Sequence, residues 1–217
     1  SALSVLFGNI LALTQTSLKR ILAYSSIAHS GYLALGISSL SLTTALPYTA
    51  IYFYLLGYGI ASLLAFGLLM GLESSACQDI HLDDLKGLAR THPWTSCVLS
   101  ICLLSLAGFP PTVGFLGKFF IFSSAIENRL YFLVLIGAFG SVIALFYYLR
   151  IIAYMFMLPQ APTSSYQAAK PSSLLLSFSF LGLIFIFLLG TILPRPILNR
   201  LSEASKSFII ISHSHSH

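Results

Sequence analysis

One lysine within the most apolar part of the sequence is the residue best placed to carry chemistry. Lys118 lies between Gly117 and Phe119, and no acidic residue is nearer in the sequence than Glu127. A charged lysine at a bilayer centre costs about 2.5 to 3.5 kcal/mol on insertion scales, so membrane helices keep one where it faces protein or a water-filled interior. Burial favours the neutral amine, whereas water or a carboxylate favours the ammonium. We therefore predict that Lys118 is a proton relay, and the alternative is a lysine that snorkels to the membrane surface.

Residues that break helices precede this lysine. The apolar block from Trp94 to Ile126 has 33 residues, about 50 Å as one helix, which exceeds a hydrocarbon core of about 30 Å. The break is predicted at a hinge that prolines and glycines favour: Gly108, Pro110, Pro111 and Gly114. The block is either two spans joined by a tight turn or one helix broken at membrane depth. Broken helices of the second kind mark ion routes in transporters.

Four further polar residues are candidates for supporting roles. His29 follows a polar stretch, residues 23–28, and can titrate near neutral pH, although a hydrogen-bonded structural histidine is our expectation. Arg150 lies near a predicted helix end, where we expect its side chain to snorkel to water. Lys19 and Tyr148 complete the set.

The composition indicates the class of protein that holds these residues. Of the 217 residues, 57% are hydrophobic and 8% are charged, and the mean hydropathy is +0.89. Soluble domains carry about 25% charged residues, so a membrane-embedded, all-α protein is predicted. The net charge of +5 comes from scattered basic residues, which argues against a nucleic-acid surface. The three cysteines are odd in number and lack CxxC spacing and a set of histidine ligands, so no zinc site or disulfide framework is expected: Cys77, Cys97 and Cys102.

Apolar blocks predict a polytopic transmembrane bundle of about six spans, one of them broken. The blocks are Ala2 to Leu18, Ile27 to Leu42, Tyr48 to Leu72, Trp94 to Ile126, Tyr131 to Leu158 and Ser172 to Leu193. Residues 73–92 are hydrophilic and predict a solvated loop or a short surface helix. Residues 159–171 have the composition of a linker. Residues 201–217 form a polar tail whose Ser/His alternation predicts disorder and no metal site. The chain begins at Ser1 without a signal-peptide pattern, which we interpret as a processed product or a fragment.

Loop charges do not decide between the two paths of the fourth block. With two spans, one side collects every basic loop residue except Lys170, as the positive-inside rule favours. With one broken span, each side holds a share: Lys19, Arg20, Lys86, Arg90 and Lys170 on one, and Arg129, Arg195, Arg200 and Lys206 on the other.

Two stretches resemble a known family. Residues 8–32 (GNILALTQTSLKRILAYSSIAHSGY) and 104–119 (LSLAGFPPTVGFLGKF) resemble the antiporter-like subunits of proton-pumping NADH:quinone oxidoreductase, respiratory complex I. Lys118, together with Tyr147, Tyr148, Leu149 and Arg150, makes the subunit 2 type (subunit N in bacteria) the best match. The resemblance runs from about residue 3 to about residue 200.

The resemblance implies a fold, a role and partners. Residues 1–158 would be the second of two inverted five-helix repeats, and residues 172–200 a final transmembrane helix. Lys118 would be the lysine of the broken helix on the proton path. The first repeat has no counterpart here, which implies a separate chain that carries it or its loss.

Several further expectations follow from the resemblance. Partners would be other membrane-arm subunits and lipids, without nucleic acid. This chain would hold no cofactor, because redox chemistry belongs to other subunits of the family. The location would be an energy-transducing membrane, the mitochondrial inner membrane slightly before the bacterial plasma membrane. A sodium/proton antiporter subunit and a purely structural membrane brace are the alternatives.

Overall fold

The structure is a computed structural model that describes residues 1–40, 46–110 apart from 73–78, 112–159 and 181–182. All regular elements in these ranges are helices: α1 (Ala2–Thr14), α2 (Leu18–Ser38), α3 (Leu46–Leu72), the 3₁₀ helix η1 (Leu82–Leu85), α4 (Leu88–Thr91), α5 (Pro93–Ala107), α6 (Val113–Glu127) and α7 (Tyr131–Phe156). An isolated β-bridge joins Ser17 to His81. The all-helical prediction is confirmed for the described residues.

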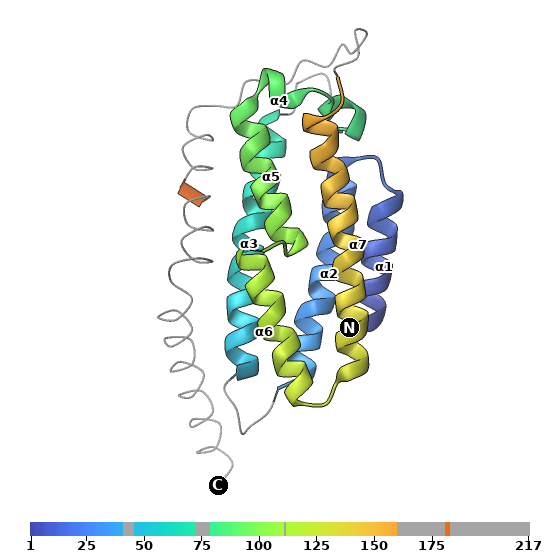
Figure 1. The fold of residues 1–217 in the computed structure, drawn as a ribbon, viewed down its shortest axis with the longest axis vertical. Coiled ribbons are helices and arrows are strands. Elements are labelled where there is room, and N and C mark those ends of the chain that lie inside the picture. The colour runs from blue at the N-terminus through green and yellow to red at the C-terminus, as the bar shows by residue number, and fades with distance from the viewer. Residues whose placement is uncertain (41–45, 73–78, 111, 160–180, 183–217) are drawn as a thin grey trace.

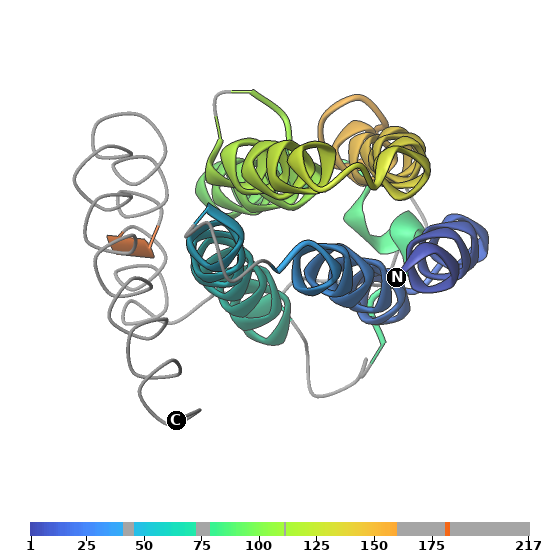
Figure 2. The same ribbon diagram turned by 90° about the horizontal axis from the view of Figure 1, so that it is seen from below.

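The long helices form two rows. Figure 2 shows α3, α2 and α1 side by side in one row, with α5 and α6 together and α7 in the other. Each row packs against the other, because α3 contacts both α5 and α6, and α1 contacts α7. Helix α2 lies in the middle and contacts α1, α3, α6 and α7. A polar side chain on the inner face of α2 is therefore surrounded by helices.

The outward faces of the bundle are strongly apolar. On α7, Phe132, Phe139 and Phe146 are each more than 60% exposed. Among the described residues, Pro47–Leu72 and Tyr131–Phe156 are the helices both long enough and apolar enough to cross a membrane. The inner face of α7 carries small and polar residues instead, such as Gly140 and Tyr147. Because lipid is as apolar as a protein core, this distribution suits contact with lipid on the outside.

Helices α5 and α6 are two parts of one interrupted path. Figure 1 shows α6 continuing along the long axis of the molecule from the point where α5 ends, with a short irregular segment between them. Gly108 ends α5 in the left-handed conformation, φ 83°, which glycine adopts without a steric penalty. Of the two alternatives for this block, the broken helix is the one observed. Pro110 lies in the break, and Pro111 is outside the described residues.

Two predicted boundaries at the first connection are wrong, and so is the end of α2, which lies at Ser38 and not at Leu42. Helix α1 ends at Thr14, before the predicted Leu18. Helix α2 begins at Leu18, nine positions before the predicted Ile27. The polar residues before Ile27 fit a helix because the hydroxyls of Ser25 and Ser26 donate to the carbonyls of Leu22 and Ala23 in the preceding turn, and Ser25 is also buried. Lys19 and Arg20 thus lie in the first turn of α2.

The remaining predictions about segments have mixed outcomes. The hydrophilic connection does hold short helices, η1 and α4, whose Leu82, Leu85 and Leu88 are buried. Helix α7 ends at Phe156, two residues before the predicted end. The linker beyond residue 159, the final helix and the polar tail lie outside the described residues, apart from residues 181–182.

Apart from Lys118 and Arg150, the described basic residues fall at both ends of the bundle. Backbone hydrogen bonds from Leu18 to Ile80 and from Leu82 to Thr16 join the α1–α2 connection to the segment before η1. Lys19, Arg20, Lys86 and Arg90 therefore share one end. Arg129 lies in the turn between α6 and α7 at the opposite end (Figure 1). This distribution is the one expected for a broken span.

Candidate functional site

The ammonium group of Lys118 lies at the broken end of α5. Its side chain is 5% exposed, so the snorkelling alternative does not hold. The Nζ atom donates hydrogen bonds to the carbonyl oxygens of Ala107, at 2.9 Å, and Leu106, at 3.3 Å. Carbonyls in the last turn of a helix lack intrahelical partners and carry its negative partial charge. The helix break therefore provides the polar partners of this buried lysine.

Close packing of the two half-helices lets Lys118 reach those carbonyls. The backbone N–H of Phe109 donates to the Leu104 carbonyl at 3.0 Å and closes the end of α5. Gly114, in the first turn of α6, approaches Ser105 so closely that a Cβ atom would overlap the Ser105 carbonyl. Gly108 and Gly114 thus fix the geometry of the break, as predicted for hinge residues.

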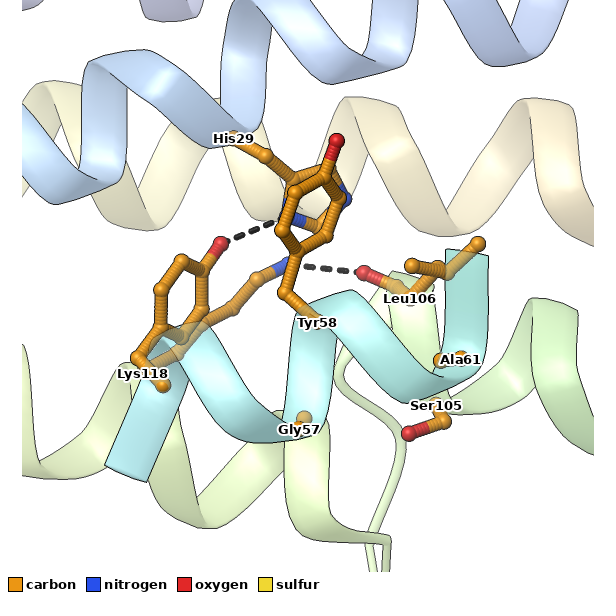
Figure 3. Close-up of a pocket in the computed structure, with 9 residues that line it drawn as sticks. His29, Gly57, Tyr58, Ala61, Ser105, Leu106 and Lys118 are labelled. Atoms are coloured by element: carbon orange, nitrogen blue, oxygen red, sulfur yellow. Dashed lines mark hydrogen bonds between the residues drawn. The ribbon is translucent and has the colours of Figure 1, made fainter. Parts of the chain in front are cut away.

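A small pocket, with room for about one water molecule, lies beside the lysine. Figure 3 shows that its walls come from α2, α3, α5 and α6. His29 and Tyr54 share a hydrogen bond of 2.6 Å between Nδ1 and the hydroxyl oxygen. The ring of Tyr58 stacks on the imidazole, with centroids 4.4 Å apart. His29 and Lys118 thus line the same pocket.

The pocket is mostly apolar, but a few buried polar groups line it, and none of its described lining residues is acidic. The hydroxyl of Ser105, which lines the pocket, is buried and has no hydrogen-bond partner in the described part of the chain. A buried cavity needs several polar partners to hold a water molecule, and Lys118, His29 and Ser105 are available. No carboxylate is among the described lining residues. Such a site can hold a proton on one nitrogen and exchange it.

The other predicted supporting residues lie outside the pocket lining. Lys19 is in the first turn of α2, ten residues before His29 and so about 15 Å from it along the helix axis. Tyr148 is fully buried and packs on Tyr147 with ring centroids 4.5 Å apart. Its hydroxyl has no hydrogen-bond partner among the described residues.

Arg150 is half-buried and reaches the connection that follows α1. Its guanidinium donates to the carbonyl oxygens of Gln15, at 2.8 Å, and Leu13, at 3.2 Å. Both carbonyls lie at the end of α1, where backbone acceptors are unpaired. Arg150 at α1 thus resembles Lys118 at α5, because each donates from another helix to the carbonyls at a carboxyl-terminal helix end.

Sequence reasoning missed the tyrosines around the lysine. Tyr54 and Tyr58 are four residues apart and so share one face of α3, a spacing that could have drawn attention to them. Tyr32 lies three residues after His29 on α2, and the Nζ atom of Lys118 is 4.9 Å from its ring centroid. The ring positions depend on how the helices rotate against one another, which the sequence does not show.

Comparison with known proteins gives matches over most of the chain. Residues 1–144 match the family described as NADH:quinone oxidoreductase/Mrp antiporter, transmembrane. One curated relative is NADH-quinone oxidoreductase subunit N of Bdellovibrio bacteriovorus, 42% identical over 159 residues, which cover 72% of this chain and 33% of the relative. The chain therefore spans about a third of that relative's length.

Solved structures match the same fold. A chain of respiratory complex I from Thermus thermophilus gives a TM-score of 0.78 at 32% identity, covering 92% of this chain and 44% of that one. A chain of the Mrp complex from Dietzia sp. gives 0.81 at 20% identity, covering 94% and 45%; at that identity it is similar in fold alone. These proteins are bacterial, so the preference for a mitochondrial membrane gains no support.

Proposed function

This chain belongs to the NADH:quinone oxidoreductase/Mrp antiporter family of transmembrane proteins, and from this premise we propose that it serves proton translocation in the membrane arm of a complex I, as part of a subunit of the N type. The observation that carries the proposal is the buried Lys118, whose ammonium is held by two carbonyls, with no carboxylate among its described partners. A lysine in that position is costly, and such residues mark proton relays in membrane proteins.

The proposed mechanism uses the two nitrogen bases of the pocket. Lys118 holds a proton as an ammonium against the end of α5, where the helix carbonyls favour positive charge. Release of this proton to water leaves a neutral amine that fits the apolar surroundings. Because two positive charges in one pocket repel each other, His29 would be neutral while Lys118 is charged. Charge that moves along the membrane arm would then shift which state is favoured, and a proton would leave on one side.

The finer architecture and the surroundings are part of the proposal. We infer that residues 1–158 form the second antiporter-like repeat and that the chain has about six spans. Other membrane-arm subunits and lipids would cover the apolar outer faces. Redox cofactors would lie on other subunits. The bacterial relatives favour a plasma membrane as the location.

The test is Lys118→Ala in the assembled complex. We expect NADH-driven proton pumping in membrane vesicles to fall at least about tenfold, because general acid–base groups contribute about 10² to 10⁴ in rate. The matched control is Lys86→Ala, which removes a lysine at the helix ends and leaves the pocket intact. Normal pumping by Lys118→Ala would overturn the relay and favour a structural brace.

A second candidate function has a specific basis in the fold match to the Mrp complex chain. The discriminating experiment is the composition of the purified complex. NADH and quinone modules that copurify with the chain support a complex I subunit. A complex made of antiporter subunits alone, with sodium/proton exchange in vesicles, supports the antiporter alternative.

A further inference from the structure

The ring of Tyr32 lies beside the ammonium group of Lys118. The Nζ atom is 4.9 Å from the ring centroid, within the range of a cation–π contact. Tyr32 is 1% exposed, so water does not weaken this contact from outside. The described residues thus offer the ammonium two kinds of partner, the carbonyls of α5 and this ring.

The hydroxyl group of Tyr32 is fixed to α7. It donates to the carbonyl oxygen of Gly137 at 3.2 Å and lies 3.0 Å from the hydroxyl oxygen of Ser141. A turn and a half further along α7, Tyr147 donates to Asn9 of α1 at 3.2 Å. The hydroxyl end of Tyr32, on the far side of the ring from its backbone, is therefore fixed to α7, which is itself hydrogen-bonded to α1.

We propose that Tyr32 is a positioning residue for Lys118, with a ring that stabilises the ammonium and a hydroxyl that ties this position to α7. This inference rests on the proposed function. An aromatic ring suits a relay better than a carboxylate, because a buried carboxylate would hold the lysine charged. The ring attracts the ammonium more weakly and leaves the proton free to exchange.

Other titratable groups near Lys118 do not replace this role. His29 on α2 and Tyr54 and Tyr58 on α3 line the same pocket, but their polar atoms and rings contact one another. Helix α5 contributes carbonyls and the Ser105 hydroxyl. Helix α7 brings Tyr147 and Tyr148 into the core cluster that contains Leu106 and Ala107, and none of these groups is acidic at neutral pH.

The test is the pH profile of NADH-driven proton pumping by Tyr32→Leu in the assembled complex. Without the ring, the ammonium loses a stabilising partner and Lys118 gives up its proton at lower pH. We expect the alkaline limb of the profile to move down by about 0.5 to 1 pH unit. Tyr32→Met is the second variant if leucine prevents assembly, because its flexible side chain refills irregular space.

Two further variants separate the ring from its surroundings. Tyr32→Phe keeps the ring and should keep the profile, with a pumping rate lowered about two- to threefold by the lost anchor. The matched control is Phe122→Leu. It removes a ring that packs on Tyr32, with ring centroids 6.2 Å apart, and it should not move the pH profile of pumping.

The outcomes distinguish this inference from the proposed function. No shift in Tyr32→Leu or Tyr32→Met beyond that of Phe122→Leu would overturn the role of Tyr32. An equal shift in Tyr32→Phe would overturn the role of the ring. If one of these two results is found and Lys118→Ala still stops pumping, the relay stands and only the Tyr32 assignment fails. If Lys118→Ala pumps normally, the relay itself fails.

Discussion

Lys118 and Lys86 both lie over tyrosine rings, one inside the bundle and one at its end. The Nζ atom of Lys118 is 4.9 Å from the ring centroid of Tyr32, and that of Lys86 is 5.7 Å from the ring centroid of Tyr154. Lys86 also pairs with Asp83 at 2.6 Å, and its side chain is 31% exposed. Lys118 is buried and has no carboxylate among the described pocket residues.

The difference shows what keeps a lysine proton exchangeable. The hydrogen bond from Lys86 to Asp83 raises the pKa of Lys86 above its ordinary value of 10.5, so this lysine stays charged at every physiological pH. Lys118 instead relies on helix carbonyls and a neutral ring, which favour the ammonium without a full opposite charge. Burial opposes that preference. A proton relay needs this balance between the charged and neutral forms of the lysine, and the pair of Lys86 with Asp83 lacks it.

The largest effect is expected where the helix break is disturbed. Gly114→Ala would place a methyl group against the Ser105 carbonyl and push α6 away from the end of α5. We expect a loss of about 1 to 3 kcal/mol in stability from overpacking. A displacement of about 1 Å at the reacting group can cost about 100-fold in rate, so pumping should fall by at least about tenfold. The measurements are the yield of assembled complex and its rate of NADH-driven proton pumping.

The matched control for this change is Gly67→Ala on α3. No described atom lies within 4 Å of a Cβ added at Gly67, and alanine favours a helix over glycine by about 1 kcal/mol. This variant should assemble and pump normally. Equal losses in both variants would show that the complex tolerates no glycine change, and the contrast between the two lysines would lose this support.

An intermediate effect is expected at the other cation that binds a helix end. Arg150→Met removes two charged hydrogen bonds to the end of α1, each worth about 1.5 to 3 kcal/mol. We expect a lower thermal midpoint of the purified complex and a pumping rate within about threefold of normal, because Arg150 does not line the pocket. Arg90→Met at an exposed site is the control. A pumping loss without a loss of stability would place Arg150 on the proton path.

The sequence predicted the relay candidate and the break for a clear physical reason. A 33-residue apolar block is too long for one span, and glycines and prolines in its middle limit where it can break. The start of α2 was missed because the stretch before His29 has a polar composition, and its burial depends on neighbouring helices. The hydrogen-bond partners of Arg150, Leu13 and Gln15, could not be predicted because they are more than 130 residues away in the sequence.

The positions of the tyrosines could not be predicted either. Nothing in the sequence distinguishes Tyr32, Tyr54 and Tyr58 from other tyrosines of membrane helices. Tyrosine also occurs at positions that face lipid or the membrane interface. Whether such a ring faces lipid or a pocket depends on the rotation of α2 and α3 against α6. The packing of helices, and not the hydropathy of any one helix, therefore completes the site.

The smallest effect is expected at the surface pair. Because the pKa of Lys86 is raised in the folded protein, its stabilising contribution is fully present below pH 10.5 and is lost as the pH rises beyond that value. Exposed pairs contribute little, so Lys86→Met should leave pumping unchanged between pH 6 and pH 9 and barely alter the thermal midpoint. Any small difference in thermal midpoint between Lys86→Met and the unmodified chain should vanish at still higher pH. A pumping profile that shifts with Lys86→Met would mean that the exposed lysine also exchanges protons, and the contrast with Lys118 would fail.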